Sequence, residues 1–252
     1  MSAHILVERF GAVQIIRMNR PEKKNAISRE MYSAMTEALT DGDDRSAIHC
    51  HVLFGLPGTF SAGADIADFQ DAATGGEPGA EALDFLLTLA RCEKPIISGV
   101  DGTAVGIGTT MNFHCDLTFA TPRTVFRTPF VDLGLVPEAG SSLLAPQILG
   151  PQKAFALLAL GEDLGAEEAR EAGFVYSVVA SSKLEDSVLS TAKLLAAKPP
   201  EALRITRDLI RGPRNDLLAR ICKESEHFEA RLHSDEARAA FAAFMRRKRE
   251  MV

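Results

Sequence analysis

Two glycine-rich segments contain the residue types that could stabilise an anion or a developing negative charge. They are GTFSAGADI at residues 58–66 and DGTAVGIG at residues 101–108, and each follows a short apolar run. Glycine lets another group approach the backbone closely, and the first peptide N–H groups of a helix have no partner within that helix. The two segments could therefore supply one N–H each to a single oxygen atom that gains negative charge.

The elements that must position these segments alternate between strands and helices. Residues 5–10 and 13–18 are rich in β-branched side chains and flank Gly11, which predicts a hairpin. Ser28 is predicted to begin a helix with Met31 and Met35 on its apolar face. Further strands are predicted at 47–54, 95–100, 115–120, 125–126 and 174–179, and a helix at 81–92. Residues 69–80 lack periodicity, which predicts a mobile loop.

The second half of the chain is mainly helical in pattern. Residues 141–173 predict short helices that Pro and Gly interrupt. Beyond residue 183 the pattern predicts helices only, at 184–198, 201–211, 215–233 and 235–249. The sequence therefore predicts an α/β core over residues 1–198 and a helical C-terminal region over residues 199–252, divided near Pro199 and Pro200.

Composition excludes several classes of partner. The 252 residues are enough for one large hydrophobic core, and the net charge of −6 disfavours nucleic acid or an anionic membrane surface. The four cysteines form no CxxC pair, so we expect no disulfide framework, no zinc site and a cytoplasmic location. No apolar run approaches the roughly 18 residues that span a bilayer. Metal-binding spacing is also absent among the histidines considered, His49, His51, His114, His227 and His233.

Five motifs, taken together, resemble the crotonase, or enoyl-CoA hydratase/isomerase, superfamily in order and spacing. This resemblance implies a crotonase-like spiral of ββα units in two roughly perpendicular sheets, followed by a helical trimerisation region. It also implies an acyl-CoA thioester substrate, no cofactor other than the CoA that the substrate carries, and a homotrimer or dimer of trimers. The motifs are RPEKKNAIS (20–28), FSAGADI (60–66), DGTAVGIG (101–108), CDLTFA (115–120) and LGLVPEAGSS (133–142).

The resemblance implies that the two oxyanion donors are the backbone N–H groups of Ala64 and Ile107. Two converging donors in a dry pocket can stabilise the enolate of a thioester by several kcal/mol. Many members of the superfamily have glycine where this chain has Ile107; the backbone N–H is unchanged, but the side chain narrows the pocket. The alternative is that both segments are only tight turns.

The acid/base residues distinguish the reactions of this superfamily. Thr110 and Phe130 stand where hydratases of the superfamily have two glutamates, and neither can transfer a proton as a carboxylate does. Glu138 resembles the single glutamate of 3-enoyl-CoA isomerases, which carries a proton from C2 to C4. Burial beside Phe130 and Leu135 is expected to raise its pKa. The alternative is a solvated acid that favours the dipole of the following helix.

The remaining candidate residues concern the CoA moiety. Arg20, Lys23 and Lys24 could meet its phosphates, or they are simply solvated charges in a turn. Phe244 and Arg247 could reach the CoA of a neighbouring subunit, or they belong to an amphipathic helix with a basic end. The resemblance implies that the nucleotide and pantetheine path is lined by Ala26, Ala62, Asp65 and Ile66.

Two further acids and several other activities remain open from the sequence. Asp116 is expected to be structural, and Asp132 is a candidate second acid. An isomerase is favoured over a hydratase, a dienoyl-CoA isomerase, a thioester hydrolase or a non-catalytic acyl-CoA-binding protein.

Overall fold

Among the residues that the structure describes, the larger of two sheets contains six strands. The computed structural model describes residues 2–68 and 80–250, apart from the side chains at 244, 245 and 247–250. The predicted hairpin is confirmed, because β1 (Ile5–Phe10) and β2 (Val13–Met18) pair antiparallel. Parallel neighbours β3 (Cys50–Phe54), β5 (Ile96–Val100), β7 (Leu117–Ala120) and β10 (Ser177–Val178) complete the order β1-β2-β3-β5-β7-β10.

The smaller sheet has the order β4-β6-β8-β9, from β4 (Thr59–Ser61), β6 (Thr103–Val105), β8 (Val125–Arg127) and β9 (Leu164–Gly165). The sequence did not predict β4, β6 and β9, because each has only two or three residues and glycine-rich segments have low strand propensity. The predicted strand at 174–179 was too long, since only the two residues of β10 pair. The predicted loop at 69–80 lies outside the described residues except for Ala80, which begins α3.

The chain alternates between the two sheets. The pairs β3/β4, β5/β6 and β7/β8 each place one strand in the larger sheet and the next in the smaller one. Helices α3 (Ala80–Arg91), α4 (Ile107–Thr110) and α5 (Ser141–Phe155) follow these three pairs in turn. The predicted α/β fold built from ββα units is therefore confirmed.

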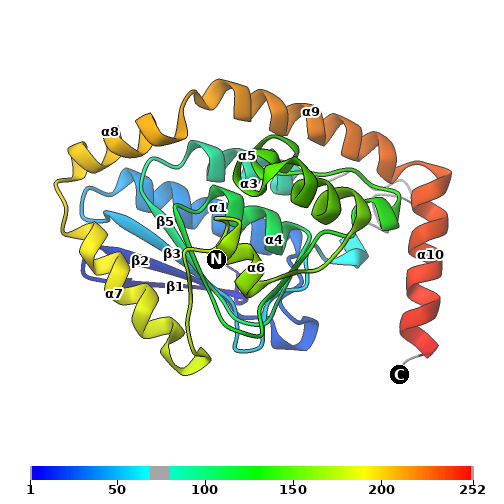
Figure 1. Cartoon of the computed structure of the whole chain (residues 1–252), viewed down its shortest axis with the longest axis horizontal. Helices are drawn as coiled ribbons and strands as arrows, with labels where there is room; N and C mark the ends of the chain where they lie inside the picture. The colour runs from blue at the N-terminus through cyan, green and yellow to red at the C-terminus, as the bar shows by residue number, and fades with distance from the viewer. Residues whose placement is uncertain (1, 69–79, 251–252) are drawn as a thin grey trace.

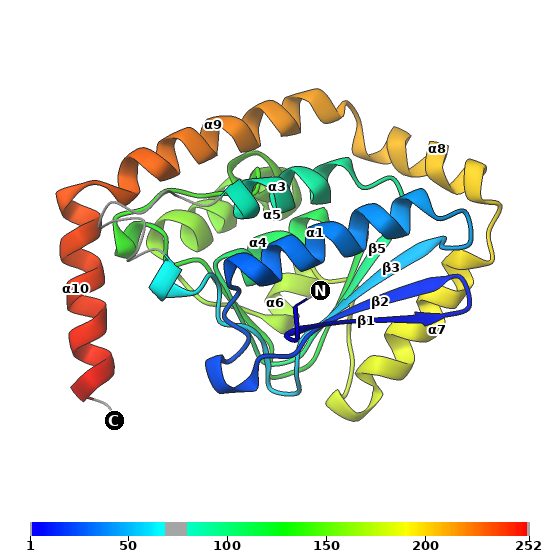
Figure 2. The same ribbon diagram turned by 180° about the vertical axis from the view of Figure 1, so that it is seen from behind.

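Helices cover both faces of the larger sheet (Figures 1 and 2). The predicted helix after Ser28 is α1 (Arg29–Asp44), which packs with α3 on one face, while α7 (Leu184–Ala196) packs on the other. The alternation of side chains along β2 explains this arrangement. Val13 and Ile15 belong to the apolar cluster beneath α7, whereas Ile16 and Met18 belong to the main core.

The C-terminal helices form an arc over α3 and α5, and α10 then turns down one side of the molecule (Figure 1). They are α8 (Pro200–Arg211), α9 (Arg214–Leu232) and α10 (Asp235–Glu250). The predicted helical C-terminal region is confirmed, and α8 begins at Pro200, one residue before the start predicted for this helix. The division into domains 1–198 and 199–252 stays a prediction.

One helical stretch among the described residues, Ser141–Leu160, is long and apolar enough to cross a membrane by length and composition. The helix is interrupted within this stretch, because Gly150 has the non-helical angles φ 76° and ψ 161° and is followed by Pro151. The π-helix η4 (Ala156–Leu160) ends the stretch, and Leu149 and Leu157 pack into the main core. The predicted break between two short helices is confirmed.

Candidate active site

A cavity of about 450 Å³ lies where both glycine-rich segments meet α1, α3, residues 129–138 and α9. Its walls are mostly apolar. Leu83 and Leu86 come from α3, and Phe228 and Leu232 come from α9. Among the described residues, the polar side chains that line it are those of Arg29, Tyr32, Asp68, Glu138, Ser225 and Glu229.

The two glycine-rich segments lie in direct contact beside this cavity. Strand β4 pairs with β6, and Gly63, at φ 91°, lies so close to β6 that a Cβ atom would be 3.0 Å from the Val105 carbonyl oxygen. A Cβ atom on Gly108 would lie 2.8 Å from the Ser61 Cβ. Glycine is therefore needed at both positions for this close approach.

The backbone N–H of Ala64 is available because of the way its neighbours pair. Ile27 N donates to Gly63 O at 2.8 Å, and Asp65 N donates to Ile27 O at 2.9 Å. The intervening N–H of an extended segment points to the opposite side from these two bonds. Ala64 lines the cavity, and its N–H has no hydrogen-bond partner within residues 2–68 and 80–250.

The backbone N–H of Ile107 is available because Ile107 is the first residue of α4. The carbonyl of the preceding Gly106 accepts hydrogen bonds from Thr109 N at 2.8 Å and Thr110 N at 2.9 Å. The N–H groups of the first turn have no acceptor within a helix, and no described residue outside α4 accepts from Ile107 N. Ile107 also lines the cavity.

Glu138 places its carboxyl group in the same cavity, so it is not the solvated acid of the alternative interpretation. Burial raises the pKa of Glu138 to about 8; the Thr110 hydrogen bond opposes this shift, and the charge of Glu224 adds to it. The Thr110 hydroxyl donates to the Glu138 carboxylate. Thr110 does not line the cavity, so it is not placed to contact a ligand as expected. Phe130 does line it, in contact with the core.

Of the polar residues that line the described part of the cavity, sequence reasoning found Glu138 but missed the other five, among them Tyr32 and Asp68. Burial raises the pKa of Tyr32 well above its usual value, with further contributions from Glu138 and Asp68. The Tyr32 hydroxyl has no hydrogen-bond partner in the described part of the chain. Burial also raises the pKa of Asp68, which accepts a hydrogen bond from Arg29 N at 3.1 Å. Helical spacing from Met35 could have placed Tyr32 on the inner face of α1.

The residues expected along the CoA path separate into two groups. Ala62 and Ile66 line the cavity. Asp65 instead accepts a hydrogen bond from Arg20 at 2.7 Å, and the same guanidinium donates to the Ala26 carbonyl at 2.9 Å. Arg20 therefore anchors the turn after β2 rather than extending into solvent as a phosphate ligand would.

Three further candidates lie elsewhere. Lys23 and Lys24 are exposed in the turn after β2, outside the cavity. The side chains of Phe244 and Arg247 lie outside the described residues. Asp132 is exposed and does not line the cavity, so its interpretation as a second acid in this cavity was wrong.

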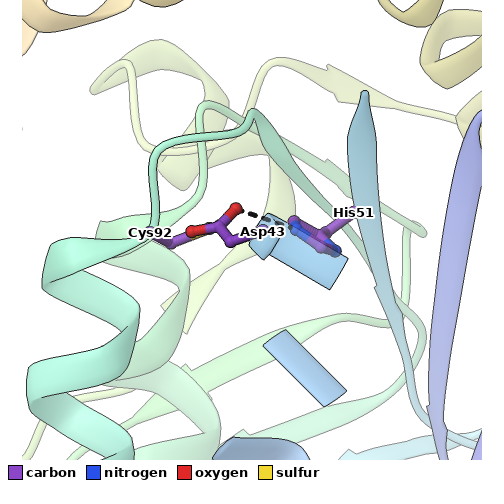
Figure 3. Close-up of side chains that lie close together, drawn as sticks. All are labelled: Asp43, His51 and Cys92. Carbon is purple, nitrogen blue, oxygen red and sulfur yellow. Dashed lines mark hydrogen bonds and ion pairs between the residues drawn. The ribbon is translucent and has the colours of Figure 1, made fainter. Parts of the chain in front are cut away.

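Asp43, His51 and Cys92 form a separate cluster outside the cavity (Figure 3). Their sequence spacing did not predict it, because Asp43 lies near the end of α1, His51 in β3 and Cys92 directly after α3. Asp43 Oδ1 lies 3.3 Å from His51 Nε2 and accepts from Cys92 Sγ at 3.4 Å, while Oδ2 accepts from Glu93 N at 2.8 Å. A metal would need the Cys92 thiolate, but burial raises the pKa of this thiol. The cluster fits a hydrogen-bonded support for the turn after α3.

Asp116, expected to be structural, ties α8 to the larger sheet. Its carboxylate accepts from Ile96 N at 2.8 Å, from Arg207 Nε at 2.9 Å and from Arg211 Nε at 3.0 Å. Arg207 is only 5% exposed, so this is a buried ion pair. The contacts are consistent with the structural role.

Comparisons with known proteins agree with this arrangement. A family model described as "Enoyl-CoA hydratase/isomerase" matches residues 8–251. The chain is 35% identical to rat enoyl-CoA delta isomerase 2 over 253 residues and 36% identical to the human protein over 254 residues. Each alignment covers 98% of this chain but 64% of the relative, so the chain spans about two thirds of the length of these relatives.

Solved structures give the same result. OdaA from Pseudomonas aeruginosa has a TM-score of 0.92 and 36% identity, covering 97% of this chain and 99% of that one. An enoyl-CoA hydratase/isomerase from Pseudoalteromonas atlantica T6c has a TM-score of 0.91 and 35% identity, covering 97% of both chains. Since the family model and the structural matches extend over nearly all of the chain, this protein belongs to the enoyl-CoA hydratase/isomerase family.

Proposed function

We propose that this protein is an enoyl-CoA isomerase that moves the double bond of a 3-enoyl-CoA to the 2-position. The observation that carries the proposal is the position of Glu138, a half-buried carboxyl group that lines an apolar cavity and has a raised pKa. The same cavity is lined by Ala64 and Ile107, whose backbone N–H groups lack partners in the described part of the chain. The delta isomerases among the relatives favour the same reaction.

The proposed reaction is a proton transfer within one bound substrate. The thioester oxygen accepts hydrogen bonds from Ala64 N–H and Ile107 N–H, which stabilise the negative charge of the dienolate. Glu138, ionised, removes a proton from C2 and returns it to C4, so that the double bond becomes conjugated with the thioester. The reaction consumes no water and needs no cofactor beyond the CoA of the substrate.

Water addition is disfavoured by the residues beside Glu138. A hydratase needs a second acid/base group, whereas Thr110 and Phe130 hold the corresponding positions. The Thr110 hydroxyl is engaged with the Glu138 carboxylate, and Phe130 contributes an apolar wall. This arrangement favours one base in a dry pocket.

The test offers a 3-enoyl-CoA and a 2-enoyl-CoA separately to the wild-type chain and to Glu138→Gln. We expect the wild type to convert the first substrate, measured by the ultraviolet absorbance of the conjugated thioester, and to hydrate the second slowly. Loss of a general base should lower kcat about 10²- to 10⁴-fold in Glu138→Gln. Asp132→Asn is the matched control, because it removes an exposed carboxylate from the same segment.

Each other outcome contradicts the proposal in a recognisable way. Equal turnover by Glu138→Gln would remove Glu138 from the mechanism. Hydration as fast as isomerisation would identify a hydratase. Tight binding of both thioesters without turnover of either would identify a non-catalytic acyl-CoA-binding protein.

A further inference from the structure

The segment that carries Glu138 is held by polar contacts from two directions. From the core, the Thr110 hydroxyl donates to the Glu138 carboxylate, and His114 Nε2 donates to the Ala139 carbonyl at 2.7 Å. From the C-terminal region, the carboxylate of Glu224 in α9 accepts from Gly140 N at 2.6 Å and from Ser142 N at 2.9 Å. The segment around Glu138 is therefore hydrogen-bonded on one side to Thr110 and His114 and on the other side to Glu224 of α9.

The backbone of this segment requires such support. Ala139 has φ 63° and Gly140 has φ 68°, so two consecutive residues adopt the left-handed conformation directly after Glu138. A residue with a Cβ atom rarely adopts this conformation unless its surroundings hold it there. The turn directs the N–H groups of Gly140 and Ser142 towards the same carboxylate of Glu224. Side chains of Leu217 and Ile221, also in α9, fill the space where Gly140 lacks a Cβ.

Glu224 is an unusual choice for capping a helix. It is 6% exposed, lies 84 residues away in sequence from Gly140, and burial raises its pKa. A serine or aspartate at the cap position would satisfy the same N–H groups locally. Arg220 lies nearby and lowers the pKa of Glu224, but its guanidinium donates to the Ser142 hydroxyl at 3.0 Å. Arg220 therefore neutralises the charge of Glu224 only in part, since its hydrogen bond goes to Ser142 rather than to the carboxylate.

We propose that Glu224 is a positioning residue for the reaction, which fixes Glu138 in the cavity and places a second negative charge behind it. The inference rests on the proposed function of Glu138. It means that α9 completes the active site of its own chain, since Ser225, Phe228 and Leu232 of the same helix line the cavity. The charge of Glu224 contributes to the raised pKa of Glu138.

Other ionisable groups near Glu138 could also affect how activity depends on pH. His114 has its pKa lowered to about 4 by burial and is neutral near neutral pH. The raised pKa of Tyr32 keeps its phenol neutral there as well. Within the part of the chain that the structure describes, the other charged groups that line the cavity or lie near Glu224 are Arg29, Asp68, Arg220 and Glu229.

The decisive variant is Glu224→Gln, which keeps the shape and one acceptor oxygen but removes the charge. The pKa of Glu138 should then fall, so the ionised base persists to lower pH. We expect the acidic limb of the kcat–pH profile to move down by on the order of half a pH unit. Glu226→Gln removes a charge from the exposed side of the same helix and is expected to leave the profile unchanged.

A second variant, Glu224→Ala, removes both the charge and the acceptor oxygens. It should lower kcat about tenfold or more at every pH while changing KM less, because the loss concerns the placement of the base rather than binding. A lowered melting temperature in either variant, together with an unchanged acidic limb in Glu224→Gln, would show that Glu224 is only a helix cap and would overturn the inference.

A direct titration separates this inference from the proposed function. Carboxyl-carbon NMR of glutamate-labelled protein follows the protonation of Glu138, with Glu138→Gln assigning its signal. A downward shift of that titration in Glu224→Gln supports the inference even if no isomerase activity is found. An unshifted titration contradicts it, whatever the wild type catalyses.

Discussion

A carboxyl group is a stronger base, and better matched to proton transfer near neutral pH, when its surroundings raise its pKa above the usual range of glutamate. For Glu138 the largest cause is burial in the cavity, and the two polar influences, Thr110 and Glu224, act in opposite directions. The same burial that makes the group a better base also makes its ionised form costly for the folded state. Activity and stability should therefore respond oppositely to its removal.

The first prediction at this scale concerns Glu138→Gln and folding stability. Because the folded-state pKa of Glu138 is about 8, above its unfolded value, its stabilising contribution is fully present below the unfolded pKa and is lost as pH rises to about 8. At pH 9 the glutamine variant should therefore unfold with a free energy about 1–3 kcal/mol larger than the wild type. Urea denaturation at acidic and alkaline pH measures this, and an equal difference at both pH values would contradict it.

The second residue-scale prediction concerns Thr110→Val, which keeps the volume of the side chain but removes the hydroxyl donor. The hydrogen bond from Thr110 lowers the pKa of Glu138, so its loss should raise that pKa further. We expect kcat near neutral pH to fall several-fold and to recover as the pH is raised. The kcat–pH profile should thus move opposite to that of Glu224→Gln, whereas Thr110→Ser should resemble the wild type.

Helix α8 is tied to the larger sheet by a buried ion pair. Arg207 inserts into the core and pairs with Asp116, which also accepts from the backbone of β5 at Ile96. Arg211, one turn later, donates to the same carboxylate and to the His114 carbonyl. The ion pair thereby fixes where α8 lies before α9 begins.

The element-scale prediction compares a buried pair with an exposed one. Arg207→Ala leaves the Asp116 carboxylate without its main partner and should lower the free energy of unfolding by about 3–5 kcal/mol. Arg204→Ala breaks the exposed pairs with Glu201 and Asp208 on the same helix and should lower the free energy of unfolding far less, because water and salt screen exposed charges. Chemical denaturation measures both, and equal costs would show that the Asp116 contact does not anchor α8.

At the scale of the whole molecule, large apolar side chains remain exposed on α7 and α8. Leu209 is 79% and Ile210 is 80% exposed, and Leu194 and Ile205 lie on the same two helices. Large apolar side chains that gather on the surface of a protein often mark the place where a partner binds. We propose that further copies of this chain cover it, in the homotrimer or dimer of trimers expected from the sequence. The cytoplasmic location stays a prediction.

The corresponding measurement is the molar mass in solution. Light scattering after size exclusion should give three or six times the chain mass for the wild type. Replacing Leu209 and Ile210 together by Asp should reduce that mass, because neither side chain is needed for the core of one chain. An exposed apolar residue elsewhere, Phe155 on α5, provides the control when it is changed to Asp. A monomeric wild type would contradict the proposal.

The sequence was enough to predict most helices, most strands of the larger sheet and the order of the functional segments. The β1–β2 hairpin, the interrupted helix at Gly150 and the helices from Leu184 onward follow from local periodicity and from Gly and Pro, which act over a few residues. The glycines at 63 and 108 predicted that some other group comes close to the backbone there, but the sequence did not show which group. That information depends on the pairing of β4 with β6.

Only the tertiary structure decided which polar groups meet. Glu224 reaches Gly140 across 84 residues, and Tyr32 shares the cavity with Glu138, although no local pattern connects them. Conversely, Arg20 has the charge of a phosphate ligand but is paired with Asp65. The physical reason is that burial and charge–charge contacts depend on distance in space, which the chain sets only once its sheets and helices have packed.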